Sequence, residues 1–154
     1  MPKKSDVRRY ILLPPRGIQT GETSNPETIA VSALGRKGTY PANSVESGDV
    51  QSPFGKDKNN YITSFSNVGP EIDITGPGDG IISTFPGGFA VLDGTSMACP
   101  AVTGIAARLI SARPEILSMN RNQARSDEMA KAIFQKAQVL GLGPNFEGQG
   151  LVKI

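Results

Sequence analysis

The sequence predicts an α/β fold, because short apolar segments bounded by turn residues are followed by two longer helical patterns. The chain has 154 residues, enough for one domain with a hydrophobic core. Apolar residues make up 38% and charged residues 19%, which is typical of a globular protein rather than a disordered one. The 18 glycines and 12 prolines predict many tight turns and favour a loop-rich α/β architecture over a helix bundle.

The strand candidates are short and lie before the helices. Residues 1–27 are expected to form an N-terminal arm and loop, with a possible strand at 9–13 that ends at two prolines. Residues 28–34 are mostly apolar, as a buried parallel strand would be, and residues 35–60 form a polar surface excursion. Further short strands, separated by glycine and proline turns, are predicted at 61–65, 72–75, 81–85 and 89–92.

A helix is predicted over residues 98–110, where only Thr103 and Arg108 are clearly polar. A helix that is apolar nearly all round is expected to be buried. Pro100 is tolerated in the first turn, so the helix should begin near Ser96 or Met97 and end before Pro114.

A second helix is predicted over residues 126–138, with Ser126 as its cap. Its apolar stripe is expected to pack in the core, and residues 148–152 should form a turn and a short closing strand. The stripe consists of Met129, Ile133, Phe134 and Ala137.

Composition excludes several classes of function. A net charge of +2 gives no reason to expect a nucleic-acid partner, and no stretch is long enough to span a membrane. Without a signal-peptide pattern, a cytoplasmic location is expected. Cys99 is the only cysteine, so no intrachain disulfide can form. No clustered Asp, Asn and Glu loop predicts calcium, and neither a metal nor another cofactor is expected.

The sequence contains no histidine, the commonest general base near neutral pH. The residues of this chain therefore cannot complete Ser-His or Cys-His catalysis among themselves.

Ser96 is the candidate nucleophile, because it lies at the start of a predicted buried helix after a glycine turn. Backbone N–H groups at a helix N-terminus favour negative charge, so the Ser96 N–H could stabilise an oxyanion. The other interpretation is that Ser96 only caps the helix, a common role for serine that geometry alone favours.

A family resemblance adds to this geometry. Gly94-Thr95-Ser96-Met97-Ala98 followed by Pro100 resembles the nucleophile motif of the subtilisin-like serine peptidases, the subtilases. Residues 65–78, 29–33 and 148–152 resemble, in order, the stretch before that nucleophile, an inner strand and the closing turn and strand of the family.

The resemblance implies the C-terminal part of a parallel-sheet sandwich with helices on both faces, incomplete in this chain. It places a partial subtilase domain at residues 28–154 and implies that Ser96 is the catalytic serine. The family's aspartate and histidine precede the serine along the chain, so they belong before the matching region.

Nothing in residues 1–27 matches those partners. Asp6 lacks a family-like setting, and Asn25 does not match the oxyanion asparagine. Ala101 stands where many subtilisins have a non-catalytic histidine. Asp73, Asp79 and Asp93 are interpreted as turn formers rather than catalytic acids. We therefore expect no useful activity from the chain alone.

Three functional hypotheses follow. The chain is a peptidase portion that is inactive alone, half of a split peptidase that a partner chain completes, or a non-catalytic protein-binding module. A completed enzyme would act on peptide or protein substrates. An exposed sheet edge is expected to favour a partner chain or self-association.

Overall fold

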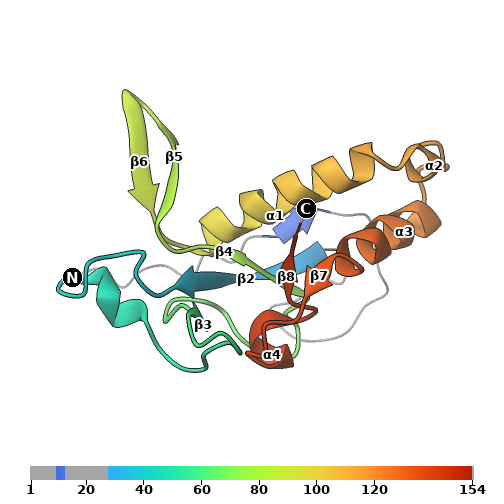
Figure 1. Cartoon of the computed structure of the whole chain (residues 1–154). Helices are drawn as coiled ribbons and strands as arrows, with labels where there is room; N and C mark the ends of the chain where they lie inside the picture. Colours follow the sequence, from blue (N-terminus) through green and yellow to red (C-terminus); the bar gives the residue numbers. More distant parts are fainter. Residues whose placement is uncertain (1–9, 13–27, 154) are drawn as a thin grey trace.

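The apolar segment predicted at 28–34 forms the longest strand of a mixed sheet (Figure 1). The computed structural model describes residues 10–12 and 28–153. In chain order the elements are β1 (Tyr10–Leu12), β2 (Thr28–Arg36), the 3-10 helix η1 (Glu46–Asp49), β3 (Asn60–Ile62), β4 (Ile74–Pro77), β5 (Ile81–Phe85), β6 (Gly88–Leu92), α1 (Thr95–Ser111), α2 (Pro114–Leu117), α3 (Gln123–Phe134), β7 (Ala137–Gln138), α4 (Pro144–Glu147) and β8 (Leu151–Val152).

The main sheet has the order β1-β2-β4-β8-β7, and β3 pairs with the far end of β2. The pairs β2/β4 and β4/β8 are parallel, which confirms an α/β fold with a parallel-containing sheet. The pairs β1/β2, β2/β3 and β7/β8 are antiparallel. The short strand predicted near residue 10 is confirmed as β1, which lies beside Thr28–Ala30 of β2. The rest of the predicted arm lies outside the described residues.

Side chains alternate between the two faces of the sheet along β2, and each face packs against different elements. Ile29, Val31 and Ala33 pack with α1 and α3 in the larger core cluster. On the other face, Leu34 joins a smaller cluster with β3 and the 140–142 segment, and the Ser32 hydroxyl donates to the Phe146 carbonyl of α4 (2.6 Å). Helices thus lie on both faces of the sheet, and the long ones share one face.

The prediction that the first long helix is buried all round is wrong. Only one stripe of α1 is buried, while Pro100, Thr103, Gly104 and Ala107 are exposed. The helix also begins earlier than predicted, at Thr95, so Pro100 lies beyond the first turn. An apolar sequence predicts what a helix can bury, whereas the neighbours that are present decide what it does bury.

Several boundaries differ from the predictions by a few residues. The strand predicted at 61–65 is Asn60–Ile62, and the helix predicted at 126–138 is α3, Gln123–Phe134, whose last predicted residues belong to β7. The predicted cap Ser126 is wrong, because the Asn122 side chain accepts the hydrogen bond from the Arg125 N–H (3.2 Å). Asparagine competes well for this role, and it was available one turn earlier.

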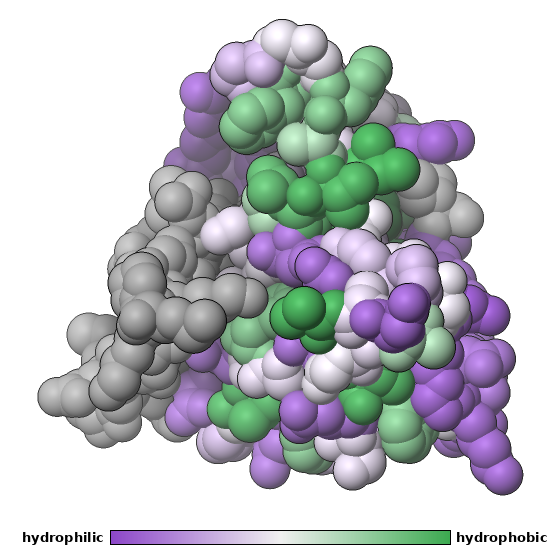
Figure 2. Space-filling model, turned by 90° about the vertical axis from the view of Figure 1, so that its left-hand side faces the viewer, coloured by the Kyte–Doolittle hydropathy of each residue, from purple (hydrophilic) through white to green (hydrophobic). Residues whose placement is uncertain are grey.

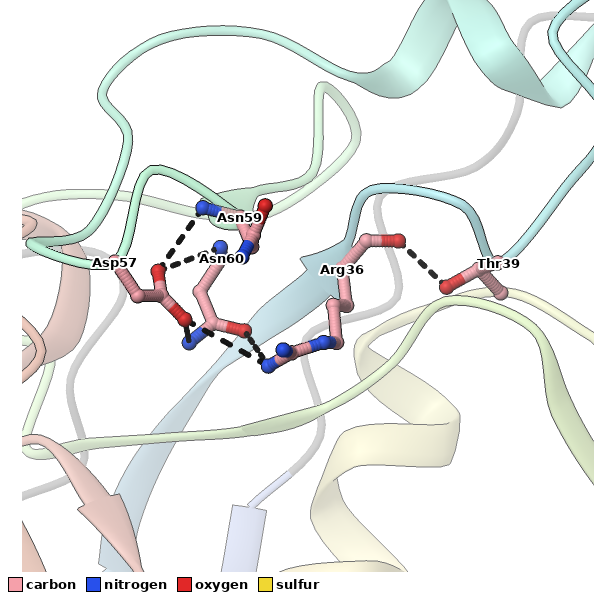
Figure 3. Close-up of polar contacts among 5 residues, drawn as sticks. All are labelled: Arg36, Thr39, Asp57, Asn59 and Asn60. Atoms are coloured by element: carbon pink, nitrogen blue, oxygen red, sulfur yellow. Dashed lines mark hydrogen bonds and ion pairs between the residues drawn. The ribbon is translucent and has the colours of Figure 1, made fainter.

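The polar excursion after β2 returns through a turn built on Asp57 (Figure 3). The Asp57 carboxylate accepts the backbone N–H groups of Asn59 (3.0 Å) and Asn60 (3.1 Å). These two hydrogen bonds, with help from the Arg36 guanidinium 3.6 Å away, lower the pKa of Asp57. The turn aligns β3 with the end of β2.

Candidate active site

Ser96 is the second residue of α1, where the chain leaves the β5–β6 hairpin (Figure 1). The hairpin ends at Leu92, and Asp93 and Gly94 form the connection. Gly94 has φ 149° and ψ 159°, a conformation that only glycine adopts readily. A glycine here therefore allows the sharp turn from strand to helix.

The structure does not support the interpretation of Ser96 as a helix cap. The N-cap is Gly94, which has no side chain, and its carbonyl accepts the N–H groups of Met97 (2.9 Å) and Ala98 (3.2 Å). Among the hydrogen bonds between described residues, none uses the N–H or hydroxyl of Ser96. Both groups are therefore available to a ligand at the positive end of a helix.

Ser96 lies on the exposed face of α1. A helical residue shares its face with the residues 4, 7, 8 and 11 positions after it. Ser96 is therefore aligned with Pro100, Thr103, Gly104 and Ala107, all of which are exposed. Every one of these residues is small or weakly polar and uncharged. Among the described residues, no heavy atom outside its own helix would lie within 4 Å of an ideal Cβ on Gly104. This face, which we call the Ser96 face, offers space for close approach of another polypeptide backbone.

The opposite face of α1 is held tightly against the sheet. A Cβ on Gly76 of β4 would lie 2.6 Å from Val102 Cγ2 and 3.0 Å from the Ala98 carbonyl oxygen. Only glycine permits this approach. This contact therefore fixes the distance between the sheet and the helix that carries Ser96.

Three aspartates predicted to form turns make specific hydrogen bonds. Asp73 Oδ2 accepts the Ala30 N–H (2.9 Å) and joins β4 to β2. Asp79 Oδ2 accepts the Tyr61 hydroxyl (2.5 Å), and Asp93 Oδ1 accepts the Tyr40 hydroxyl (2.7 Å). These contacts give each carboxylate a structural role in the turns before Ser96.

Sequence reasoning did not find Tyr40, Tyr61 or Glu147. Each makes its contacts across the fold, and a tyrosine in a polar segment or a single glutamate gives no periodic signal. The Glu147 carboxylate is 1% exposed and accepts four backbone N–H groups, from Leu140 to Gly143, at 2.6–3.2 Å.

Asp6 and Asn25 lie outside the described residues. No group of three or more acidic or cysteine side chains in the described part of the chain is arranged to hold a metal ion. The described helices are all too short or too polar to cross a bilayer.

Comparison with known proteins decides the family. The model of the subtilase family matches residues 15–150. The chain belongs to the subtilase family. This subtilase is 38% identical to the thermostable alkaline protease of Halalkalibacterium halodurans over 140 residues, which cover 88% of the chain and 36% of that relative.

Two other relatives differ in their named location. The chain is 32% identical to the halolysin-like extracellular serine protease Nep of Natrialba magadii, over 81% of the chain and 22% of that protein. It is 38% identical to the intracellular serine protease of Paenibacillus polymyxa, over 60% of the chain and 28% of that protein. This subtilase thus spans between about a fifth and two fifths of the length of these relatives.

Proposed function

We propose that this chain is the nucleophile-bearing portion of a subtilisin-like serine endopeptidase, with Ser96 as the nucleophile. The placement of Ser96 is the main support: at the N-terminus of α1, neither its hydroxyl nor its N–H has a hydrogen-bond partner among the described residues. Attack by the hydroxyl on a peptide carbonyl creates an oxyanion, which the Ser96 N–H can stabilise. The substrate class is a peptide or protein.

In the family the general base is a histidine, and this sequence has none. The chain alone is therefore proposed to be inactive. We propose that a separate polypeptide chain supplies the base. The Ser96 face is where it would pack, because that face leads directly to the Ser96 hydroxyl.

Labelling with a fluorophosphonate probe tests this proposal. The purified chain is incubated with the probe alone and with lysate of its source cells, and the modified residue is located by peptide mass spectrometry. We expect label on Ser96 only in the lysate, and none in Ser96→Ala. Absence of label in both conditions would contradict the proposal of a nucleophile completed by a partner.

Gly104→Leu tests the Ser96 face itself. The new side chain would meet no described atom outside its own helix, and leucine favours a helix more than glycine does, so the isolated chain should be at least as stable as the parent. The same side chain would obstruct a polypeptide that packs along the face, so labelling in lysate should fall. Unchanged labelling would show that the partner does not pack along the Ser96 face at Gly104.

One observation favours a second candidate, a non-catalytic protein-binding module. The β5–β6 hairpin projects from the body, and Figure 2 shows apolar surface gathered on it. The large apolar side chains there are exposed, including Ile82 (70%) and Phe89 (78%). Such a patch is typical of interaction surfaces. Partner capture that survives Ser96→Ala but fails in Phe89→Ser would favour this candidate.

A cytoplasmic location remains a prediction, because one relative is named extracellular and another intracellular. Fractionation of source cells with an antibody against the chain tests it. Recovery in the culture medium would contradict it.

A further inference from the structure

Two aspartates flank the base of the β5–β6 hairpin, and each accepts a hydrogen bond from a tyrosine. Asp79 lies two residues before β5, and Tyr61 donates to its Oδ2 at 2.5 Å. Asp93 directly follows β6, and its Oδ1 accepts both the Tyr40 hydroxyl and the Gly80 N–H, each at 2.7 Å. Both legs of the hairpin are thus tied at their base.

Tyr61 is part of the main sheet, and Tyr40 belongs to the segment that leaves it after β2. Tyr61 belongs to β3, which pairs with the end of β2, and it is 1% exposed. Its ring lies on Gly35 of β2, where a Cβ would come within 2.5 Å of the ring. Tyr40 lies four residues beyond β2, in the polar excursion. The hydrogen bonds therefore connect the hairpin base to the sheet.

The hairpin needs such anchors because it has little else to orient it. Among the described strands, β5 and β6 pair only with each other. An isolated two-stranded hairpin is marginally stable. Most residues of both strands are exposed. Its direction relative to the sheet must be set at its base.

The hairpin base is also the turn that presents Ser96. The Gly94 N–H donates to the Gly78 carbonyl (2.8 Å), so the two legs meet directly before α1. Asp93 adjoins Gly94, whose carbonyl begins the hydrogen bonding of α1. A movement of the Asp93 leg would therefore move Gly94 and the two unengaged groups of Ser96.

We propose that Tyr40 and Tyr61 are positioning residues, which clamp Asp93 and Asp79 and thereby hold the turn that presents Ser96. The clamp consists of these four side chains, and its role in catalysis rests on the proposed function. The two tyrosines lie far from the nucleophile motif in the sequence. Tyr40 is 53 residues from its partner Asp93, and Tyr61 is 18 residues from its partner Asp79.

The state of protonation suits the clamp. Burial, and then the adjoining carboxylate of Asp93 or Asp79, raise the pKa of Tyr40 and of Tyr61 above the ordinary value. Both hydroxyls therefore keep their protons through the neutral range and donate to the carboxylates.

Amide hydrogen exchange on the 154-residue chain tests the clamp without any need for activity. In Asp93→Ala and in Tyr40→Phe/Tyr61→Phe, we expect about tenfold faster exchange at Gly94, which itself makes no bond to Asp93. Asp93→Asn keeps an acceptor oxygen and should stay within about twofold of the parent. Ser47→Ala, which removes a hydroxyl bonded within the same excursion, is the matched control.

The Lys56 N–H, bonded to the Leu140 carbonyl at 2.7 Å, reports whether a variant is globally unstable. Unchanged exchange at Gly94, or equal acceleration at Gly94 and Lys56, would overturn the clamp. Labelling of Ser96 in lysate separates the two proposals: it should fall at least about fivefold in Asp93→Ala and persist in Asp93→Asn. Full labelling of Asp93→Ala would overturn the proposal that the clamp positions Ser96. An unlabelled parent chain would contradict the proposed function, and amide hydrogen exchange at Gly94 would then decide whether the clamp holds the turn.

Discussion

Adding one methyl group at Gly76 should push α1 away from the sheet. The new Cβ would lie 2.6 Å from Val102 Cγ2 and 3.0 Å from the Ala98 carbonyl oxygen, against an ordinary contact of about 3.5–4.0 Å. Val102 is β-branched, so it has little rotamer freedom in a helix with which to yield. The helix or the strand must therefore move by several tenths of an ångström. Overpacking of this kind costs about 1–3 kcal/mol.

Gly104→Ala is the matched control, because it makes the same substitution on the opposite face of α1. No described atom outside its own helix lies within 4 Å of the added Cβ, and alanine in an exposed helix interior is favoured over glycine by about 1 kcal/mol. Urea unfolding should therefore show Gly76→Ala less stable and Gly104→Ala more stable than the parent, with unchanged m-values. Equal effects of the two substitutions would refute the claim that close approach at Gly76 fixes α1.

Three further predictions concern polar groups. Glu147→Gln replaces a buried acceptor of four N–H groups and should cost about 2–4 kcal/mol in urea unfolding, whereas the exposed Glu128→Gln should cost less than about 1 kcal/mol. An equal loss in both would be contrary to expectation. Ser96→Ala should change stability by no more than about 0.5 kcal/mol, because Ser96 caps nothing; a loss near 1 kcal/mol would restore the capping interpretation. Burial raises the pKa of Asp79 above 3.8, so the folded state binds its proton more tightly than the unfolded state and loses stability as the pH rises through the folded pKa. Unfolding of Asp79→Asn at a series of pH values should therefore show a variant that gains on the parent as the pH rises above about 4; a pH-independent difference would contradict this.

Local patterns predicted the two strands of the hairpin well, whereas the strand predicted at 72–75 is Ile74–Pro77 and includes two of the residues expected to form the turn. Ile81–Phe85 was predicted with its observed bounds, and the strand predicted at 89–92 begins one residue earlier. Each follows from glycine and proline placed between short apolar segments. Ser96 was located by its motif, since geometry alone favoured a helix cap. The family assignment was confirmed by a match over residues 15–150.

Contacts between residues far apart in the chain could not be predicted from local sequence patterns. The Tyr40–Asp93 hydrogen bond spans 53 residues, and neither residue lies in a sequence pattern that predicts contact with the other. The exposure of α1 was mispredicted for a related reason: its sequence permits burial on every side, but the described residues cover one stripe. Periodicity reports which surfaces can be buried, and the surrounding chain determines which are.

The arrangement around Ser96 explains how a chain without histidine can still hold the proposed nucleophile in place. The position of the hydroxyl depends on Gly94, on the contact of α1 with Gly76 and on the hairpin base, all of which lie within these residues. Activation in this family depends on a histidine base, which the sequence does not contain. Positioning and activation are thus separable, and the Ser96 face is the surface at which they would be joined. Labelling rescued by a histidine-bearing polypeptide, but not in Gly104→Leu, would connect the two at that face.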